Sequence, residues 1–242
     1  MISAEKRDGD LYFLEVSEIG ANHRAMLLPN QDAISSLCIG ENFVLAVADG
    51  VGSCQKADLG AKAAVEACVT TFERIVNRTV CFDNAIMAKT IIDGWKAKLG
   101  HVELDECCTT LKAVFKLGDT LKIVSLGDGF VAVSSDGIKI LSPAEDNAFT
   151  NETNCLRSRT REGDFWLYDF HLDMYKPYAI ICCTDGVANG LVAGSELDLV
   201  EEIEKRISQD NLKAEVEELV VDISNYCFDD KTIGVVKYER KN

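Results

Sequence analysis

Acidic residues stand at the ends of apolar runs in four places along this 242-residue chain. They are Asp49 after VLAVA, Asp128 after KIVSLG, Asp185 after YAIICCT, and the pair Asp229-Asp230 shortly before TIGVV. A strand buried on both faces cannot hold a charge in its interior, but it can present one at its end. Carboxylates that converge on one spot repel one another unless a cation lies among them. The pattern therefore predicts an oxygen-rich site for divalent metal ions.

Short apolar or alternating segments, rich in Val, Ile, Leu and Phe, predict the strands that would position these acids. These segments cover residues 11–17, 43–48, 108–116, 119–126, 130–134, 138–141, 164–170, 178–184 and 232–238. Apolar residues at helical spacing predict helices over 57–76 and 83–99, with Asp83 as the N-cap of the second. Two more helices are predicted near the C-terminus, at about 195–207 and 216–223.

The order of these elements favours one fold class. Strands, two helices, a long block of strands, two helices and a final strand do not alternate as in a regular α/β fold. The order fits an α+β fold, a four-layer αββα sandwich of two mostly antiparallel sheets flanked by helix pairs. No repeat or Pro-rich linker divides the chain, so we predict one domain over 1–242. Residues 142–163 are polar and lack periodicity, which predicts a long surface loop or flap.

Composition narrows the function classes. The net charge of −15 argues against binding to a nucleic-acid backbone, which attracts clustered Lys and Arg. No run of about 18 apolar residues predicts a membrane span, and the charged N-terminus lacks a signal-peptide core. The 10 cysteines contain no CxxC pair, so we expect reduced, mostly buried thiols and a cytoplasmic protein. The oligomeric state is not predicted.

Asp-Gly occurs six times, and the other three copies have simpler interpretations. Asp136-Gly137 separates two alternating segments and predicts a β-hairpin turn. Asp8-Gly9 belongs to the N-terminal segment, and Asp93-Gly94 falls inside a helical pattern. The copies at Asp49, Asp128 and Asp185 would individually be read as turns or caps, and the metal hypothesis depends on their common place at strand ends.

A series of short motifs then points to a known family. They are Gly20-x-x-His23 with Asn30-Gln31-Asp32-Ala33; Val47-Ala48-Asp49-Gly50-Val51-Gly52-Ser53 with Gly60-Ala61; Cys108-Thr109-Thr110-Leu111; Gly127-Asp128-Gly129; Asn151-Glu152-Thr153; Thr184-Asp185-Gly186-Val187; and Asp229-Asp230-Lys231-Thr232. Each motif is weak alone. Together, in this order, they make the chain resemble the metal-dependent serine/threonine protein phosphatases of type 2C, in particular their compact bacterial branch. The resemblance implies an αββα sandwich with a two-metal cleft between the sheets.

The resemblance also implies roles for individual residues. Asp49 would bridge two Mn²⁺ or Mg²⁺ ions, and the Gly50 carbonyl would bind one of them. Asp185 and Asp229 would hold the other ion, with Asp229 preferred over Asp230. Asp32 would act largely through water, and Asp128 would offer a carboxylate to a third, weaker metal.

The implied reaction is hydrolysis of phosphoserine or phosphothreonine in a phosphorylated protein. Carboxylate and carbonyl oxygens suit Mg²⁺ or Mn²⁺ better than Zn²⁺. Two such ions activate a water molecule and stabilise both ends of an in-line phosphoryl displacement. The predicted catalytic residues are Asp49 and Asp185 with His23 and Arg24.

His23 and Arg24 are included among the predicted catalytic residues because the chain departs from the family pattern. Larger members place a His directly after the bridging Asp-Gly, where this chain has Val51, and an Arg shortly before the metal Asp. His23 is the nearest substitute as a proton donor, and Arg24 is the nearest substitute as a phosphate contact. Gly129 also replaces the commoner Ser after Asp128.

Three alternatives remain open from the sequence. The first is a pseudophosphatase that keeps the fold as a binding module. The second is a cysteine-dependent phosphatase, which needs Cys-x5-Arg and finds it at Cys155 to Arg161 and at Cys68 to Arg74. The third is an N-terminal-nucleophile hydrolase, for which nothing near Met1 shows a processing signal.

The segment 142–163 contains one more notable group. Arg157, Arg159 and Arg161 cluster within an acidic protein, and they would either be solvated or contact the phosphosubstrate from a flap. The role of Asn151-Glu152-Thr153 in the same segment cannot be derived from the residues.

Overall fold

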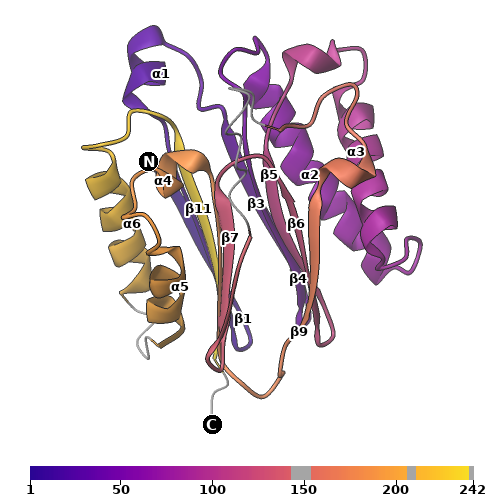
Figure 1. Cartoon of the computed structure of the whole chain (residues 1–242), viewed down its shortest axis with the longest axis vertical. Helices are drawn as coiled ribbons and strands as arrows, with labels where there is room; N and C mark the ends of the chain where they lie inside the picture. Colours follow the sequence, from indigo (N-terminus) through magenta and orange to yellow (C-terminus); the bar gives the residue numbers. More distant parts are fainter. Residues whose placement is uncertain (143–153, 206–210, 240–242) are drawn as a thin grey trace.

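Two antiparallel sheets pack face to face, and helices cover both outer sides (Figure 1). The coordinates are a computed structural model that describes residues 1–142, 154–205 and 211–239. The four layers are those expected from the order of elements in the sequence, so the predicted αββα class is confirmed.

The first sheet has six strands in the order β1-β2-β11-β10-β7-β8. Their bounds are Ile2–Asp8 (β1), Leu11–Glu18 (β2), Lys231–Tyr238 (β11), Tyr178–Cys183 (β10), Phe130–Ser135 (β7) and Ile138–Leu141 (β8). Strands β2, β11, β10 and β7 are the most buried, because they lie inside the sheet and both of their faces are covered.

The second sheet has five strands in the order β3-β4-β5-β6-β9. Their bounds are Asp32–Ile39 (β3), Asn42–Asp49 (β4), Leu111–Leu117 (β5), Thr120–Leu126 (β6) and Trp166–His171 (β9). The register pairs Asp32 of β3 with Asp49 of β4, so these two acids are neighbours at one end of the sheet.

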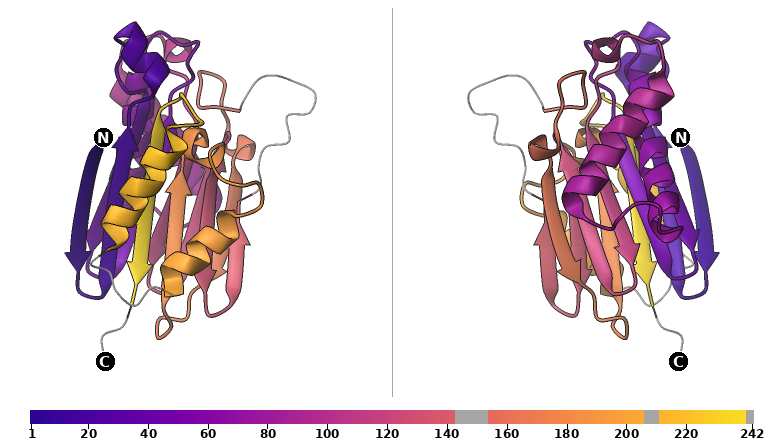
Figure 2. Two further views of the ribbon diagram at one scale, coloured as in Figure 1. Left: turned by 90° about the vertical axis from the view of Figure 1, so that its left-hand side faces the viewer. Right: turned by 90° about the vertical axis from the view of Figure 1, so that its right-hand side faces the viewer.

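The helices form the outer layers (Figure 2). Helices α2 (Ala57–Val76) and α3 (Asn84–Leu99) cover the five-stranded sheet, and α5 (Glu196–Lys205) and α6 (Leu212–Ile223) cover the six-stranded sheet. Shorter elements are α1 (Ala21–Met26), α4 (Asp185–Ala188) and two 3₁₀ turns, Leu104–Glu106 and Glu162–Asp164. The predicted N-cap holds, because the Asp83 side chain accepts the Ile86 N–H at 3.1 Å.

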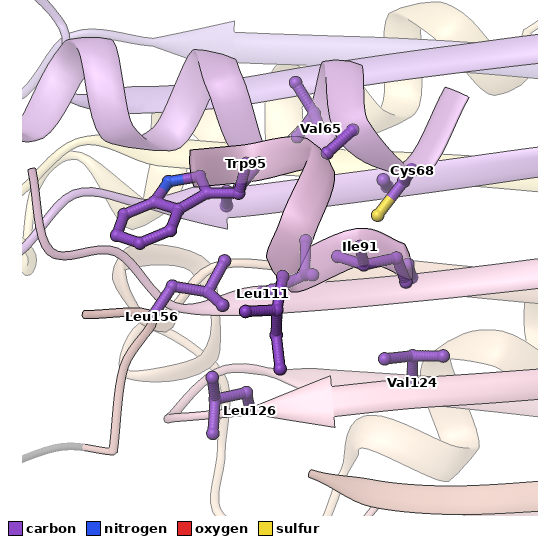
Figure 3. Packing of buried hydrophobic residues seen from close by; sticks show 14 of the residues in the cluster. Val65, Cys68, Ile91, Trp95, Leu111, Val124, Leu126 and Leu156 are labelled. Carbon is purple, nitrogen blue, oxygen red and sulfur yellow. The ribbon is translucent and has the colours of Figure 1, made fainter. Parts of the chain in front are cut away.

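Three apolar clusters hold the four layers together. One lies between α2, α3 and the five-stranded sheet, a second lies between the C-terminal helices and the other sheet, and a third fills the space between the sheets. Figure 3 shows part of the first cluster, in which Trp95 and Ile91 of α3 lie over Leu111, Leu126 and Leu156. Burial of these faces fixes where each strand ends, and so fixes the acids at those ends.

Sequence patterns missed two strands, two short helices and the two 3₁₀ turns, and found the other described elements. Strands β1 and β3 lie at sheet edges, and their mixed polar sequences lack the apolar signature of a buried strand. Helices α1 and α4 are too short to show periodicity. The hairpin at Asp136-Gly137 is confirmed between β7 and β8, and Asp8-Gly9 forms the turn between β1 and β2. No helix in the described ranges is long and apolar enough to cross a membrane.

Candidate metal centre and active-site cleft

Three of the strand-end acids meet at one point. A carboxylate oxygen from each of Asp49, Asp128 and Asp185 lies within 4.8 Å of the other two. Asp49 ends β4 of the five-stranded sheet, Asp128 lies in the turn from β6 to β7, and Asp185 begins α4 directly after β10. The two sheets therefore each supply part of one carboxylate cluster at the end of the sandwich that carries α1 (uppermost in Figure 1).

Asp32 lies next to the cluster, paired with Asp49 on the neighbouring strand, but it is not among the residues that line the cleft. Its Oδ2 accepts the Thr184 hydroxyl at 2.8 Å, which ties β3 to the other sheet across the interior. Its Oδ1 is buried and has no hydrogen-bond partner among the described residues, and the same holds for Oδ1 of Asp185. Burial, with the nearby charges of Asp230 and Asp185, raises the pKa of Asp32 to about 8.

Backbone hydrogen bonds hold Asp49 in place, and its side chain lines the cleft. The Asp49 N–H donates to the Thr110 hydroxyl at 3.0 Å, and its carbonyl accepts from the Thr110 N–H and the Thr109 hydroxyl, both at 2.8 Å. Burial and the charges of Asp32 and Asp185 raise the pKa of Asp49 well above its ordinary range. Burial, and then the Asp128 charge, likewise raise the pKa of Asp185.

Adjacent residues Asp229 and Asp230 have opposite environments. Asp229 is exposed and lines the cleft. Asp230 is only 2% exposed and accepts the N–H groups of Gly20 and Gln31 at 2.6 Å each, together with His23 Nδ1 at 2.8 Å. Asp230 therefore holds the segment that carries His23 against the start of β11.

The acids open into a cleft of about 510 Å³. It is lined by Asn22, His23, Met26, Gln31, Asp49, Gly50, Val51, Gly52, Ser53, Cys54, Cys108, Thr110, Cys155, Arg157, Asp128, Asp185 and Asp229. Arg24 is not among these residues, because its guanidinium pairs with Glu18 and donates to the Ile19 carbonyl at 2.8 Å. The structure thus places His23 in the cleft and Arg24 outside it, and it brings Arg157 in.

The turn that carries Asp128 explains why Gly follows it. Gly127 and Gly129 have φ of +84° and +77°, a region that disfavours side chains. A Cβ at Gly129 would lie 2.4 Å from the carbonyl oxygen of Cys183, so a Ser cannot fit here without a shift of the backbone. Beneath the turn, the buried Lys112 donates to Ser125 Oγ at 2.7 Å and to the Gly127 carbonyl, which supports the turn from inside.

These donors suit hard divalent cations. Buried carboxylate oxygens without partners are costly. Burial first, and then the charges of neighbouring acids, raise the pKa values of Asp32 and Asp49, so ionising these acids together is unfavourable. A cation among them would satisfy the free oxygens and remove the repulsion, and an all-oxygen donor set favours Mg²⁺ or Mn²⁺.

Comparison with protein families decides the classification. A family model described as Protein phosphatase 2C matches residues 19–220. The chain belongs to this family. The match covers most of the chain and includes every cleft-lining residue except Asp229. A search of curated proteins gave no match.

Solved structures of several other proteins share the fold. The catalytic domain of the serine/threonine phosphatase PstP, in complex with two manganese ions, is 17% identical with a TM-score of 0.67, over 95% of this chain and 99% of that chain. RsbX in complex with magnesium is 13% identical with a TM-score of 0.68, over 98% of this chain and 100% of that chain. The S. agalactiae serine/threonine phosphatase is 16% identical with a TM-score of 0.66, over 95% of this chain and 100% of that chain.

The cysteine-dependent alternative is not favoured. Cys68 is buried within α2, and burial raises the pKa values of both Cys68 and Cys155, the reverse of what a thiolate nucleophile needs. Arg161 does not line the cleft near Cys155. The motif Asn151-Glu152-Thr153 and residues 143–153 of the expected flap lie outside the described residues.

Sequence reasoning missed the residues that hold the acids in place. Thr184 and Thr110 act through hydroxyls that bond to the cluster, and the roles of Lys112 and Asp230 depend on contacts across the fold. The Cys108-Thr109-Thr110-Leu111 motif was visible as a family pattern, but its function as a backbone support for Asp49 was not.

Proposed function

We propose that this chain is a Mn²⁺- or Mg²⁺-dependent phosphatase that hydrolyses phosphoserine and phosphothreonine in proteins. The observation that carries the proposal is the meeting of Asp49, Asp128 and Asp185 in one cleft, with Asp32 paired to Asp49 on the next strand. Oδ1 of Asp32 and Oδ1 of Asp185 are buried and have no hydrogen-bond partner among the described residues. Family membership and the manganese complex of PstP support it.

Each acid has a proposed role. Asp49 would bind both of two ions, and the Gly50 carbonyl would bind one of them. Asp185 and Asp229 would hold the other ion, and Asp128 would serve a third, weaker one. When bound, the ions supply the activation of water and the neutralisation of charge on the phosphate. Asp32 accepts a proton or a hydrogen bond beside them, since its free Oδ1 faces no protein donor among the described residues.

His23 would supply the proton to the leaving serine or threonine oxygen. The hydrogen bond that His23 Nδ1 donates to the Asp230 carboxylate fixes the ring, as a carboxylate orients a catalytic imidazole. We propose that Nε2 donates the proton. Replacement of His23 by Asn should lower kcat for a phosphothreonine peptide by about 100-fold or more. The loss should be small for p-nitrophenyl phosphate, because nitrophenolate leaves without a proton. Equal losses on both substrates would contradict this role.

Arg157 would bind the phosphate in place of Arg24. It lines the cleft, whereas the neighbouring Arg159 is exposed and does not. A guanidinium pairs well with a phosphate dianion. Arg157→Ala should raise KM for both an aryl phosphate and a phosphopeptide by about tenfold or more. Arg159→Ala is the matched control and should change KM little; similar effects of the two variants would rule out the assignment.

The decisive experiment measures turnover against metal. Purified protein, freed of metal with a chelator, should hydrolyse a phosphothreonine peptide only after Mn²⁺ or Mg²⁺ is added. Asp49→Asn should lower kcat by about 100-fold or more. Asp93→Asn, on the exposed surface of α3, is the matched control. If the wild-type protein binds Mn²⁺ in calorimetry but turns over no phosphoester, the chain is a pseudophosphatase instead.

Wider features of the sequence complete the proposal. We propose that residues 1–242 act as one domain in the cytoplasm and that the partner is a phosphorylated protein. The net charge of −15 makes a nucleic-acid partner unfavourable.

A further inference from the structure

Helix α1 lies at the mouth of the cleft and holds apolar side chains in solvent. Met26 lines the cleft and is 60% exposed, and the next two residues, Leu27 and Leu28, are 93% and 41% exposed. No residue of α1 is buried. Single apolar residues on a surface are ordinary, but three in a row beside a cleft form a patch, and such patches mark sites that bind a partner.

Leu27 combines an exposed side chain with an unfavourable backbone conformation. Its φ is +56° and its ψ is +31°, the left-handed region that Gly or Asn usually occupies where a helix ends. The N–H groups of Leu27 and Leu28 close this turn by donating to the carbonyls of Arg24 and His23, at 3.2 and 2.9 Å. Burial does not offset the strain, so neither packing nor backbone preference accounts for a leucine here, which points to contact with a partner.

Contacts to the rest of the protein hold α1 in place. Asp230 accepts the Gly20 N–H before the helix and the Gln31 N–H after it, each at 2.6 Å. It also accepts His23 Nδ1 from within the helix at 2.8 Å. One buried carboxylate thus anchors both ends and the middle of the segment, so a fixed element presents the exposed apolar residues.

A further exposed apolar residue belongs to the segment next to α1. Phe228 is 57% exposed and directly precedes Asp229, which lines the cleft. Its carbonyl accepts the Asn22 N–H at 3.2 Å, so the segment that leads into Asp229 runs beside α1 (Figure 1). We call the exposed apolar residues of these two segments the apolar rim: Met26, Leu27, Leu28 and Phe228.

We propose that the apolar rim binds an apolar side chain next to the phosphorylated residue of the protein substrate. This proposal rests on the proposed phosphatase function and specifies the substrate class. His23 and Met26 lie three residues apart on α1, so they share one side of the helix, and both line the cleft. A substrate whose leaving oxygen meets His23 therefore carries its neighbouring residues past Met26 to Leu27.

The rim would select substrates by the residues that flank the phosphorylated one. An apolar side chain that packs against Leu27 removes apolar surface of both partners from water. A polar side chain at the same place gains nothing from that contact. A small aryl phosphate fits at the carboxylate cluster without reaching the rim, so its turnover does not depend on this contact.

The test compares two phosphothreonine peptides that differ only in the residues on either side of the phosphothreonine, Leu in one and Ser in the other. With Mn²⁺, the wild-type protein should have a kcat/KM about tenfold higher for the Leu peptide. Leu27→Asn should bring this ratio close to one, because Asn removes the apolar side chain and is tolerated in left-handed backbone. The melting temperature of this variant should equal or exceed that of the wild type, which checks its folding.

Tyr175→Asn is the matched control. Tyr175 is 74% exposed in the loop between β9 and β10, at the end of the sandwich opposite to α1 (Figure 1). This variant loses an exposed apolar side chain of similar accessibility, but it should keep the wild-type ratio. A ratio that falls equally in both variants would overturn the rim.

The other outcomes separate the rim from the enzyme. Equal kcat/KM for the two peptides in the wild type, or a preference that Leu27→Asn retains, would overturn the rim. A wild-type dimer in sedimentation that Leu27→Asn dissociates would also overturn it, since the patch would then bind a second copy of the chain.

If neither peptide nor p-nitrophenyl phosphate is hydrolysed with Mn²⁺, the phosphatase function fails, and binding then tests the rim. Fluorescence anisotropy measures the affinity of the two peptides for the wild type and for Leu27→Asn. Binding of the Leu peptide that is about tenfold weaker in the variant would keep the rim. Equal binding to the two proteins would overturn it.

Discussion

Asp32 and Asp230 are carboxylates at the same end of the molecule, yet they have opposite surroundings. Asp230 is buried and accepts two backbone N–H groups and the His23 ring. Asp32 receives the Thr184 hydroxyl on one oxygen, and its other oxygen is buried without a partner in the described residues. The first carboxylate completes a network inside the protein, whereas the second is left to be completed by something else.

This difference separates structural acids from functional ones. A buried acid with all its partners stabilises the fold, and removing it leaves donors unsatisfied. A group of buried acids that crowd together lowers the stability of the metal-free protein, and removing one relieves repulsion. Substituting an acid of the cluster should therefore lower activity but raise the stability of the metal-free protein. Substituting Asp230 should lower both.

The largest expected effect is at Asp185. Asp185→Asn should lower Mn²⁺-dependent turnover by about 100-fold or more, because it removes a proposed ligand. The same change should raise the melting temperature of the protein in a chelator, since it removes one of the mutually repelling charges. Activity and thermal unfolding, measured on the same samples, check the pair of outcomes. If Asp185→Asn lost activity and stability together, Asp185 would be a structural acid like Asp230, and the difference between the two kinds of acid would not hold.

Asp230→Asn should instead lower the stability of the metal-free protein. Asn keeps the size but replaces a charged acceptor with an amide, so the contacts to Gly20, Gln31 and His23 weaken. We expect a loss of about 1.5–3 kcal/mol in the free energy of unfolding, measured in urea without metal. Asp229→Asn is the matched control at the adjacent exposed residue and should leave this free energy nearly unchanged. A loss of stability at Asp229 as large as that at Asp230 would contradict the role of Asp230 in holding the His23 segment against β11.

The sequence was most informative where the signal was local. Long amphipathic stretches predicted α2 and α3, and apolar runs predicted the buried strands, because burial imposes a period that one segment displays by itself. The strand-end position of Asp49, Asp128 and Asp185 could be predicted for the same reason.

Residues whose roles depend on contacts between distant segments could not be predicted. Arg24 is next to His23 in sequence, but the helical turn of α1 sends it to Glu18, while Arg157 reaches the cleft from a segment paired with Thr109. The preference for Asp229 over Asp230 came from family resemblance; the burial that distinguishes them lies in the packing of β11 against Gly20.

The cluster also predicts how stability depends on pH. The pKa of Asp32 is about 8 in the metal-free fold against 3.8 in the unfolded chain, so between these values the folded protein holds the proton more tightly. Its contribution to stability is full below about pH 4 and is lost as the pH rises through about 8. In a chelator, the free energy of unfolding should therefore fall with rising pH, by up to about 1.4 kcal/mol per pH unit from this group.

Two controls sharpen the pH experiment. Asp32→Asn should flatten the decline in urea titrations across this range, because Asn does not titrate. Mn²⁺ binds the deprotonated acids, so its stabilising effect should grow as the pH rises. A wild-type protein without metal that gains stability between about pH 5 and 8 would show that the acids are not buried together as the structure has them.

The smallest expected effect concerns the turn that delivers Asp128. Gly129 and Gly137 have nearly the same φ, +77° and +78°, and Ala at either should lose about 1–2 kcal/mol of stability from the backbone alone. A Cβ at Gly129 would meet the Cys183 carbonyl at 2.4 Å, whereas one at Gly137 would meet nothing within 4 Å. Gly129→Ala should therefore lose about 1–3 kcal/mol more than Gly137→Ala in urea unfolding. Equal losses would mean that the Asp128 turn can move away from β10, and the cluster would then be less rigidly positioned than the Asp230 network.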